Sequence, residues 1–363
     1  MDVRSIAVSS AVVTALVVAG CGQRTAVPVS PRLTEPTSTG IVPSGVPTEG
    51  ARPPAAGLPP AAEPQTAPPP IVSPAGQLVR VGAVPEGVAV DSLTRLVAVA
   101  TRDPDEVVLI SADSAAITGR IPLPGSARHV ELAASGGPML VPVETADALV
   151  RVELPQGRAQ PPILTGTSPH DAAQAPDGAV FVTNELGGTV AVLRGDRVIK
   201  VFTDRVQPAG VAAAGTAVGV LDVRANTLTI YDSATLSIVG SVRAGVGPTH
   251  LVADRHGRMI AADTGGNAVR VFVPLPAPHE VASIAQPGGP YGIAYDANRD
   301  RVWVASSGTN EVIGYDMNQP TPRAVQRFPT VQDPYTLGVD VSTGRLFVAG
   351  VSGRVIEIIS PKP

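Results

Sequence analysis

A unit of about 40 residues that recurs through most of the chain constrains the fold more than any other feature of the sequence. Each unit starts at a corner, usually a proline, that is followed by an apolar stretch. The corners are Pro85, Ala127, Pro169, Pro208, Pro248, Pro290 and Pro334. Successive corners are 42, 42, 39, 40, 42 and 44 residues apart. This period is typical of the four-stranded blades of a β-propeller.

The interior of one unit supports the same interpretation. Short β-branched or alternating runs occupy residues 292–295, 301–305, 311–316 and 324–328, and Asp, Asn, Gly or Pro separates them. Four such runs predict four strands in each unit. The Asp residues in the turns between the first two strands are interpreted as turn-forming residues.

The two ends of the repeat region predict how the ring closes. The last unit supplies three strands and then the chain stops, whereas residues 76–85 have the pattern of a fourth strand that leads into the next corner. Pairing this early strand with the last unit leaves no terminal blade with an exposed lateral face. The sequence therefore predicts an all-β, seven-bladed propeller over residues 77–363, closed by an N-terminal strand.

Three phrases of the sixth unit carry a family resemblance. Residues 290–296 read PYGIAYD, residues 301–305 read RVWVA, and residues 310–316 read NEVIGYD. This repeat resembles that of the YVTN and lactonase-like propeller superfamily, and the resemblance covers residues 77–363. The superfamily includes sugar-lactone hydrolases, streptogramin-type lyases, surface-layer proteins and many lipoproteins, so the resemblance implies a fold and leaves the function open.

The N-terminus has the pattern of a secretion signal. Arg4 precedes an apolar run from Ile6 to Val18, which is shorter than the roughly 20 residues that span a bilayer as a helix. Residues 18–21 read VAGC and resemble the bacterial lipobox, which implies cleavage after residue 20 and a diacylglyceryl thioether, with palmitate-type acyl chains, on Cys21. Cys21 is the only cysteine of the chain. We therefore expect a signal peptide at 1–20 and a lipoprotein anchored on the extracytoplasmic side of the cell membrane, and the excess of Arg over Lys suggests an actinobacterial source.

A proline-rich stretch separates this signal from the repeats. From residue 22 to about residue 75 the sequence consists largely of Pro, Ala, Thr and Ser. Proline removes backbone donors and fixes φ, so the segment cannot form regular ladders and favours extended polyproline conformations. Residues 21–76 are accordingly predicted to be a disordered stalk that holds the propeller away from the membrane.

The charge balance excludes one class of partner. The chain has 27 Lys and Arg against 31 Asp and Glu, which gives a formal net charge of −4, and neither sign forms a long run. A nucleic-acid-binding protein usually presents a basic patch or stripe. We expect no nucleic-acid partner, and nothing in the sequence requires more than a monomer.

Candidate site residues come from the loops that meet around one opening of the propeller channel. The unit corners place His129, His170, Asp171 and His250 there, and the ends of the second strands offer Glu144, Asn184, Glu185, Asp222 and Asp263. Imidazole and carboxylate groups together can hold a divalent metal or act as acid and base. The alternative is that the histidines donate to the backbone of a neighbouring blade and hold the ring together. Tyr291 and Tyr335, in adjacent corners, offer either an aromatic contact for a ligand or simple packing.

No known catalytic motif accompanies these residues. The sequence has no Gly-x-Ser-x-Gly elbow, no His-Glu-x-x-His, no phosphate-binding loop and no calcium loop. The first hypothesis is therefore a binding module for an envelope protein, a glycan or a small ligand. The second is a metal-assisted hydrolase or lyase with its site at the channel opening, and a purely structural role in the envelope is the third.

Overall fold

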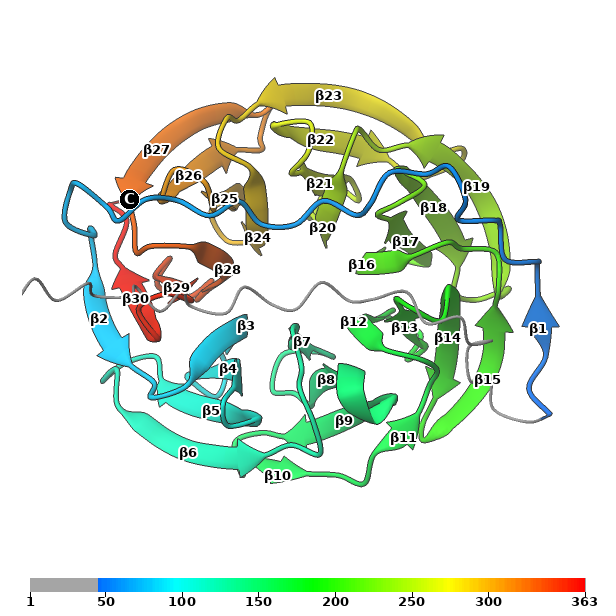
Figure 1. The fold of residues 1–363 in the computed structure, drawn as a ribbon, viewed down its shortest axis with the longest axis horizontal. Helices are drawn as coiled ribbons and strands as arrows, with labels where there is room; N and C mark the ends of the chain where they lie inside the picture. The colour runs from blue at the N-terminus through cyan, green and yellow to red at the C-terminus, as the bar shows by residue number, and fades with distance from the viewer. Residues whose placement is uncertain (1–44, 363) are drawn as a thin grey trace, which may run out of the picture. The chain divides into compact units, whose positions relative to one another are not determined.

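The repeat region forms a ring of seven antiparallel sheets around a central channel (Figure 1). The computed structural model describes residues 45–362. Each sheet is one blade, and the first strand of each blade packs against the first strands of its two neighbours. The prediction of an all-β, seven-bladed propeller is confirmed. Within residues 45–362, no helix is long and apolar enough to cross a membrane.

The first four blades follow one another in sequence. Blade 1 comprises β3 (Val84–Asp91), β4 (Leu96–Arg102), β5 (Glu106–Ser111) and β6 (Ile117–Pro122). Blade 2 comprises β7 (Glu131–Leu132), β8 (Met139–Val143), β9 (Ala148–Glu153) and two short outer strands, β10 (Arg158–Ala159) and β11 (Ile163–Leu164), with a 3₁₀ helix, η1 (Glu144–Ala146), after β8. Blade 3 comprises β12 (Pro169–Gln174), β13 (Val180–Asn184), β14 (Thr189–Arg194) and β15 (Arg197–Phe202). Blade 4 comprises β16 (Pro208–Ala214), β17 (Ala217–Asp222), β18 (Thr227–Asp232) and β19 (Ser237–Arg243).

The other three blades complete the ring. Blade 5 comprises β20 (Pro248–Ala253), β21 (Met259–Asp263), β22 (Ala268–Val273) and β23 (His279–Ala285). Blade 6 comprises β24 (Pro290–Asp296), β25 (Arg301–Ser306), β26 (Glu311–Asp316) and β27 (Arg323–Pro329). Blade 7 comprises β28 (Pro334–Val339), β29 (Leu346–Gly350), β30 (Val355–Ile359) and, as its outer strand, β2 (Gln77–Arg80).

Blade 7 joins the two ends of the propeller. β2 pairs antiparallel with β30, with Gln77 opposite Ile358 and Arg80 opposite Val355. The buried carboxylate of Glu357 accepts hydrogen bonds from the Gly76 amide at 2.7 Å and the Val331 amide at 3.0 Å, which fixes the segment leading into β2. The predicted closure by an N-terminal strand is therefore confirmed.

The hydrophobic core is divided among the contacts between blades. Eight clusters of buried apolar side chains are present in the described residues, and seven of them each join two neighbouring blades. The eighth and smallest consists of Val84, Tyr291, Tyr335 and Val351. Valine, alanine, leucine and isoleucine make up most of each cluster, because a strand buried on both faces needs compact side chains on both. The low aromatic content of the sequence suits this division into thin layers.

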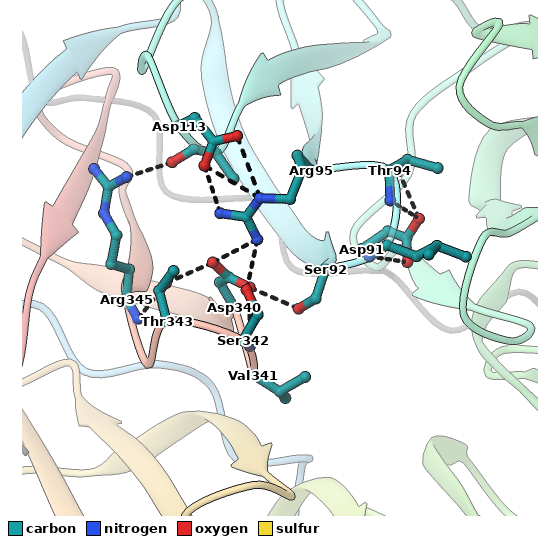
Figure 2. A network of polar contacts seen from close by, with 12 residues as sticks. Asp91, Ser92, Thr94, Arg95, Asp113, Asp340, Val341, Ser342, Thr343 and Arg345 are labelled. Atoms are coloured by element: carbon teal, nitrogen blue, oxygen red, sulfur yellow. Dashed lines mark hydrogen bonds and ion pairs between the residues drawn. The ribbon is translucent and has the colours of Figure 1, made fainter.

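A polar network joins blades 1 and 7 on the face that carries the turns between first and second strands (Figure 2). The fully buried carboxylate of Asp340 accepts from the Ser92 hydroxyl at 2.7 Å and forms an ion pair with Arg95, also at 2.7 Å. Arg95 also pairs with the exposed Asp113 at 2.7 Å. Hydrogen bonds to its turn hold the pKa of Asp340 below its usual value, although burial alone would raise it. This network stabilises the contact between the last blade and the first, which we call the seam.

Residues 45–75, which we call the strap, differ from the expected free stalk. They are extended, as proline-rich sequence favours, but they run across the propeller between β1 (Thr48–Glu49) and β2 (Figure 1). β1 adds a parallel strand to the outer edge of β15, with Thr48 opposite Val201. Side chains of the blades supply the hydrogen bonds that the proline-rich segment cannot make within itself. The predicted signal peptide at 1–20, Cys21 and the first part of the stalk lie outside the described residues.

Candidate functional site at the channel mouth

The corners of the repeat build one end of the channel, which we call the channel mouth. In six blades the pairing of the first two strands shifts register directly after the corner. Such a bulge bends the strand and re-aims its side chains. Two tiers of residues result. The first tier is Glu86, Arg128, His170, Ala209, Thr249, Tyr291 and Tyr335, and the second is Gly87, His129, Asp171, Gly210, His250, Gly292 and Thr336.

Glycine in the second tier makes room for the histidines of the next blade. A β-carbon on Gly87 would lie 2.7 Å from the Arg128 carbonyl oxygen, directly before His129. A β-carbon on Gly210 would lie 2.8 Å from the Thr249 carbonyl oxygen, directly before His250. Neither distance is tolerated by a real side chain, so these two corners pack backbone against backbone. The close approach sets the position from which His129 and His250 extend.

Three of the predicted histidines meet at the mouth. The ring of His129 lies 4.6 Å from that of His170 and 4.7 Å from that of His250, measured between centroids. The Nε2 atoms of His129 and His250 are 3.1 Å apart. His129 belongs to blade 2 and His250 to blade 5, so their contact spans the two intervening blades, of which blade 4 has only the small side chain of Ala209 in the first tier. All three histidines are buried.

His170 lies between two carboxylates. Its Nδ1 atom is 3.1 Å from Oε1 of Glu144 and 3.2 Å from Oε2 of Glu185. These two glutamates follow β8 and β13, so they occupy the same position in blades 2 and 3. Burial alone would lower the pKa of His170, but the charges of Glu185 and Glu144 and their hydrogen bonds raise it to about 10. His170 is therefore an imidazolium at neutral pH.

The guanidinium of Arg128 completes this charged group. Its Nε atom lies 3.3 Å from Oε1 of Glu144, and both side chains are largely buried. The pKa of Glu185 falls to about 2 in spite of burial, because His170 and Arg128 stabilise its charged form. Two cations therefore face two carboxylates, and the group is close to neutral as a whole.

The other two histidines are neutral. Burial, together with the positive charges of His170 and Arg128, lowers the pKa of His250 to about 3. Burial and the neighbouring His170 likewise hold the pKa of His129 well below its usual value. The Nδ1 atom of His250 is buried without a hydrogen-bond partner among the described residues. The mouth thus combines one charged histidine with two neutral ones.

Three predicted aspartates, Asp171, Asp222 and Asp263, accept hydrogen bonds from backbone amides and are not part of the charged group at the mouth. Asp222 accepts from the amides of Val206 at 2.7 Å and Ala225 at 2.9 Å. Asp263 accepts from the amide of Gly247 at 2.9 Å and pairs with an arginine of its own blade. Both carboxylates lie at strand ends, and their hydrogen bonds to backbone amides cap the adjoining loops.

Asp171 also binds the backbone, although it lies in the second tier. It accepts from its neighbour Ala172 at 2.8 Å and from Val211 of the next blade at 2.9 Å. These bonds tie blade 3 to blade 4. The side chain is buried, and burial raises the pKa of Asp171 to about 6.

The two predicted tyrosines continue the row of histidines. The ring of Tyr291 packs edge-on against His250 at 4.3 Å and lies 5.8 Å from the ring of Tyr335. Each tyrosine is only 8% exposed. They are packing residues of the mouth in this structure, with little surface left for a ligand.

Two members of the site were missed in the sequence. Arg128 stands in the same corner position as His170, and this shared position is the signal that identifies it. Glu63 comes from the strap and lines a small pocket with Arg128, His170 and Glu185. No local pattern marks Glu63, because only the path of the strap brings it there. The pocket measures about 20 Å³, which is room for about one water molecule or one small polar group.

Comparisons with known proteins place the fold and leave the site open. The chain matches no family model, and no curated protein matches it in sequence. A chain of the Kuenenia stuttgartiensis hydrazine synthase is similar in structure, with 15% identity and a TM-score of 0.67, covering 78% of this chain and 97% of that one. Virginiamycin B lyase from Staphylococcus aureus has 15% identity and a TM-score of 0.64, covering 78% and 98%. A chain of the mitotic checkpoint complex has 9% identity and a TM-score of 0.69, covering 83% and 97%.

Proposed function

We propose that this chain is a lipid-anchored, extracytoplasmic binding module that holds its ligand at the channel mouth. The observation that supports this proposal is the buried group of Arg128, Glu144, His170 and Glu185 beside a pocket sized for one polar group. Buried charges of both signs can pair with the polar end of a ligand, such as the end of a glycan or a side chain of an envelope protein. The similarity to a chain of the mitotic checkpoint complex fits a module that binds protein.

A thermal-shift screen tests this function. The soluble form of the full chain, with Cys21→Ser, is screened against a panel of glycans and small polar compounds. At least one compound should raise the Tm, and the shift should disappear in Arg128→Ala. Arg327→Ala is the matched control, since the exposed Arg327 pairs with Glu311 on the two outer strands of blade 6. A panel without hits, or hits that survive Arg128→Ala, would contradict the proposed site.

The membrane anchor is a separate part of the proposal. It is supported by the lipobox-like residues 18–21 and by the fact that Cys21 is the only cysteine of the chain. Two or more acyl chains give stable anchoring, whereas one chain is marginal. Cys21→Ala should leave an unprocessed precursor or release the protein from the membrane fraction, as measured by fractionation and intact mass. A fully processed, membrane-bound Cys21→Ala protein would contradict lipidation.

The second candidate is a metal-assisted lyase or hydrolase, and one observation favours it. Glu144, His170 and Glu185 each offer a ligand atom, and these atoms all lie within 4.8 Å of one another. The buried Oε2 atom of Glu185 faces Nδ1 of His170 at 3.2 Å, and a nitrogen with two carboxylate oxygens suits a divalent cation, which would take the place of the proton on His170. These three residues would hold the ion, which would polarise a substrate carbonyl or activate water. The resemblance in fold to virginiamycin B lyase fits this candidate.

Elemental analysis distinguishes the two candidates. Protein purified without chelator is examined by mass spectrometry for metals and melted with and without EDTA. A stoichiometric metal that is lost in Glu185→Gln, together with a lower Tm in EDTA, would favour the enzyme and justify a screen of lactones and esters. A metal-free protein whose Tm does not respond to EDTA leaves the binding module as the supported function.

A further inference from the structure

Between residues 55 and 68 the strap is held by hydrogen bonds to its backbone, whereas nearer β1 the side chains of Glu49 and Arg52 contact Lys200 and the Val206 carbonyl. The guanidinium of Arg224 donates to three strap carbonyl groups, those of Ala55 at 3.2 Å, Leu58 at 3.1 Å and Pro59 at 3.0 Å. Further along the face, the Asn310 side-chain amide donates to the Pro68 carbonyl at 2.9 Å. These hydrogen bonds are all made to backbone carbonyl groups of an extended segment and involve none of its side chains.

The donor pattern matches the chemistry of a proline-rich chain. Proline has a carbonyl acceptor and no N–H donor, so a surface that binds such a chain must supply mainly donors. Arg224 and Asn310 do so in two different blades. Ala67 is not a proline and therefore has an amide to donate. The blades supply an acceptor for it, because the Ala67 amide donates to Oδ1 of Asp333 at 3.0 Å. The Ala67 carbonyl accepts from the side-chain amide of Gln332 at 2.9 Å, as the other strap carbonyls accept from donors of the blades.

Glycines on the blade loops let the strap lie close to this face. A β-carbon on Gly247 would come within 2.8 Å of the β-carbon of Ala62. A β-carbon on Gly289 would come within 2.8 Å of the Gln65 side chain, and one on Gly308 within 2.5 Å. Together with the donors, these positions form a shallow track over blades 4 to 7, which we call the strap track.

Little apolar burial holds the strap in the track. Within residues 45–75, Ala67 is the only buried residue, and the others are exposed or half-buried. A segment held by surface hydrogen bonds with few buried apolar contacts opens at a low free-energy cost compared with global unfolding. Residues 51–75 can therefore leave the track while the seven clusters between the blades remain intact, since only Val46, outside this range, packs against one of them.

We propose that the strap track is an interaction surface for an extended, proline-rich segment of another polypeptide, and that the strap is its internal competitor. The same side chains that bind the strap carbonyls bind those of the incoming segment, and displacement of the strap also uncovers the pocket beneath Glu63. This inference goes beyond the ligand at the channel mouth, since it depends on the strap contacts alone.

A disulfide lock tests the exchange. The soluble full chain with Cys21→Ser carries the pair Ala62→Cys and Gly247→Cys, whose β-carbons lie near the 3.5–4.5 Å that a disulfide requires once the exposed strap shifts outward by about 1 Å. The probe is a fluorescein-labelled peptide of residues 51–70, followed by fluorescence anisotropy. The reduced protein should bind the probe, and the oxidised protein should bind it at least tenfold more weakly. The reduced form is the control for the substitutions themselves.

Two further measurements make the result specific. Ala67→Pro removes the strap amide that donates to Asp333, so the strap loses this hydrogen bond while the probe can still form it. The strap then competes less well, and this variant should bind the probe about tenfold more tightly than the parent protein. A probe in which every proline is replaced by alanine should bind at least tenfold more weakly. The proposal is overturned if the probe fails to bind both the reduced and the Ala67→Pro proteins, or if oxidation leaves its affinity unchanged. If, in that case, the Tm shift caused by a mouth ligand still disappears in Arg128→Ala, the mouth binds its ligand without any exchange of the strap.

Discussion

Individual residues at the channel mouth owe their protonation to neighbours that are distant in sequence. His170 is charged because Glu144 and Glu185 face it, whereas His129 and His250 are neutral because they are buried beside that charge. Histidines in different corners of the same mouth thus have different charge states. The contact between His129 and His250 joins residues that are 121 positions apart.

This arrangement predicts an acid-sensitive propeller. The folded-state pKa of His250 is about 3 against an ordinary value of 6.5, so between these values the unfolded chain binds a proton that the folded chain does not. The free energy of unfolding should therefore decrease as the pH falls below 6.5, by at most about 1.4 kcal/mol per pH unit for this histidine. Urea unfolding of wild type and His250→Gln at pH 7 and pH 5 should show a smaller loss in the variant. His279→Gln, at an exposed site, is the control, and an equal loss in wild type and His250→Gln would refute the explanation.

At the scale of the element, the first strand of each blade is defined by its corner. The bulge after the corner aims two residues into the mouth, and glycine in the second tier of blades 1, 4 and 6 lets neighbouring strands approach. The strap shows the opposite behaviour, since it has almost no regular structure and takes its conformation from the surface on which it lies. The position of each first strand is therefore determined by nearby residues in the sequence, whereas the path of the strap is determined by the blades that it contacts.

Gly210→Ala tests the close contact between β16 and β20. Its β-carbon would lie 2.8 Å from the Thr249 carbonyl oxygen, so β20 must shift and move His250 with it. We expect a loss of about 1–3 kcal/mol in the free energy of unfolding, the usual range for overpacking. Gly119→Ala in β6 is the matched control, because its β-carbon would meet only the Leu109 side chain at 3.7 Å. Equal stability of the two variants in urea unfolding would show that the corners are not tightly packed.

At the scale of the whole molecule, the ring depends on its closing seam. Blade 7 takes three strands from the end of the chain and one from before the first blade, and the Asp340 network joins blade 7 to blade 1 (Figure 2). The closure of blade 7 by β2 and the Asp340 network both join residues that are more than 240 positions apart. The cooperativity of the propeller is expected to depend on them.

Asp340→Asn should weaken this seam. It removes a buried charge that pairs with Arg95 and accepts from Ser92, and the expected loss is about 2–3 kcal/mol in the free energy of unfolding. Asp113→Asn removes the other, exposed partner of Arg95 and should lower the stability much less, because solvent screens an exposed ion pair. The pKa of Asp340 is lowered in the folded state, so its contribution is present above its ordinary pKa and disappears as the pH falls through the folded value. Thermal melts in which the two variants lose equal stability would contradict this role.

The sequence by itself determined the number of blades, the strand pattern and the closure by residues 77–80, because a repeat period and an alternation of apolar residues are local properties that each unit restates. It also indicated His129, His170, His250 and Glu185, since equivalent corners must meet around one channel. Only the tertiary structure decided that Asp222 and Asp263 serve the backbone, that Arg128 joins the charged group, and that the strap crosses the mouth. These outcomes depend on which side chains of different blades come within hydrogen-bond distance, and the ring must close before those distances exist.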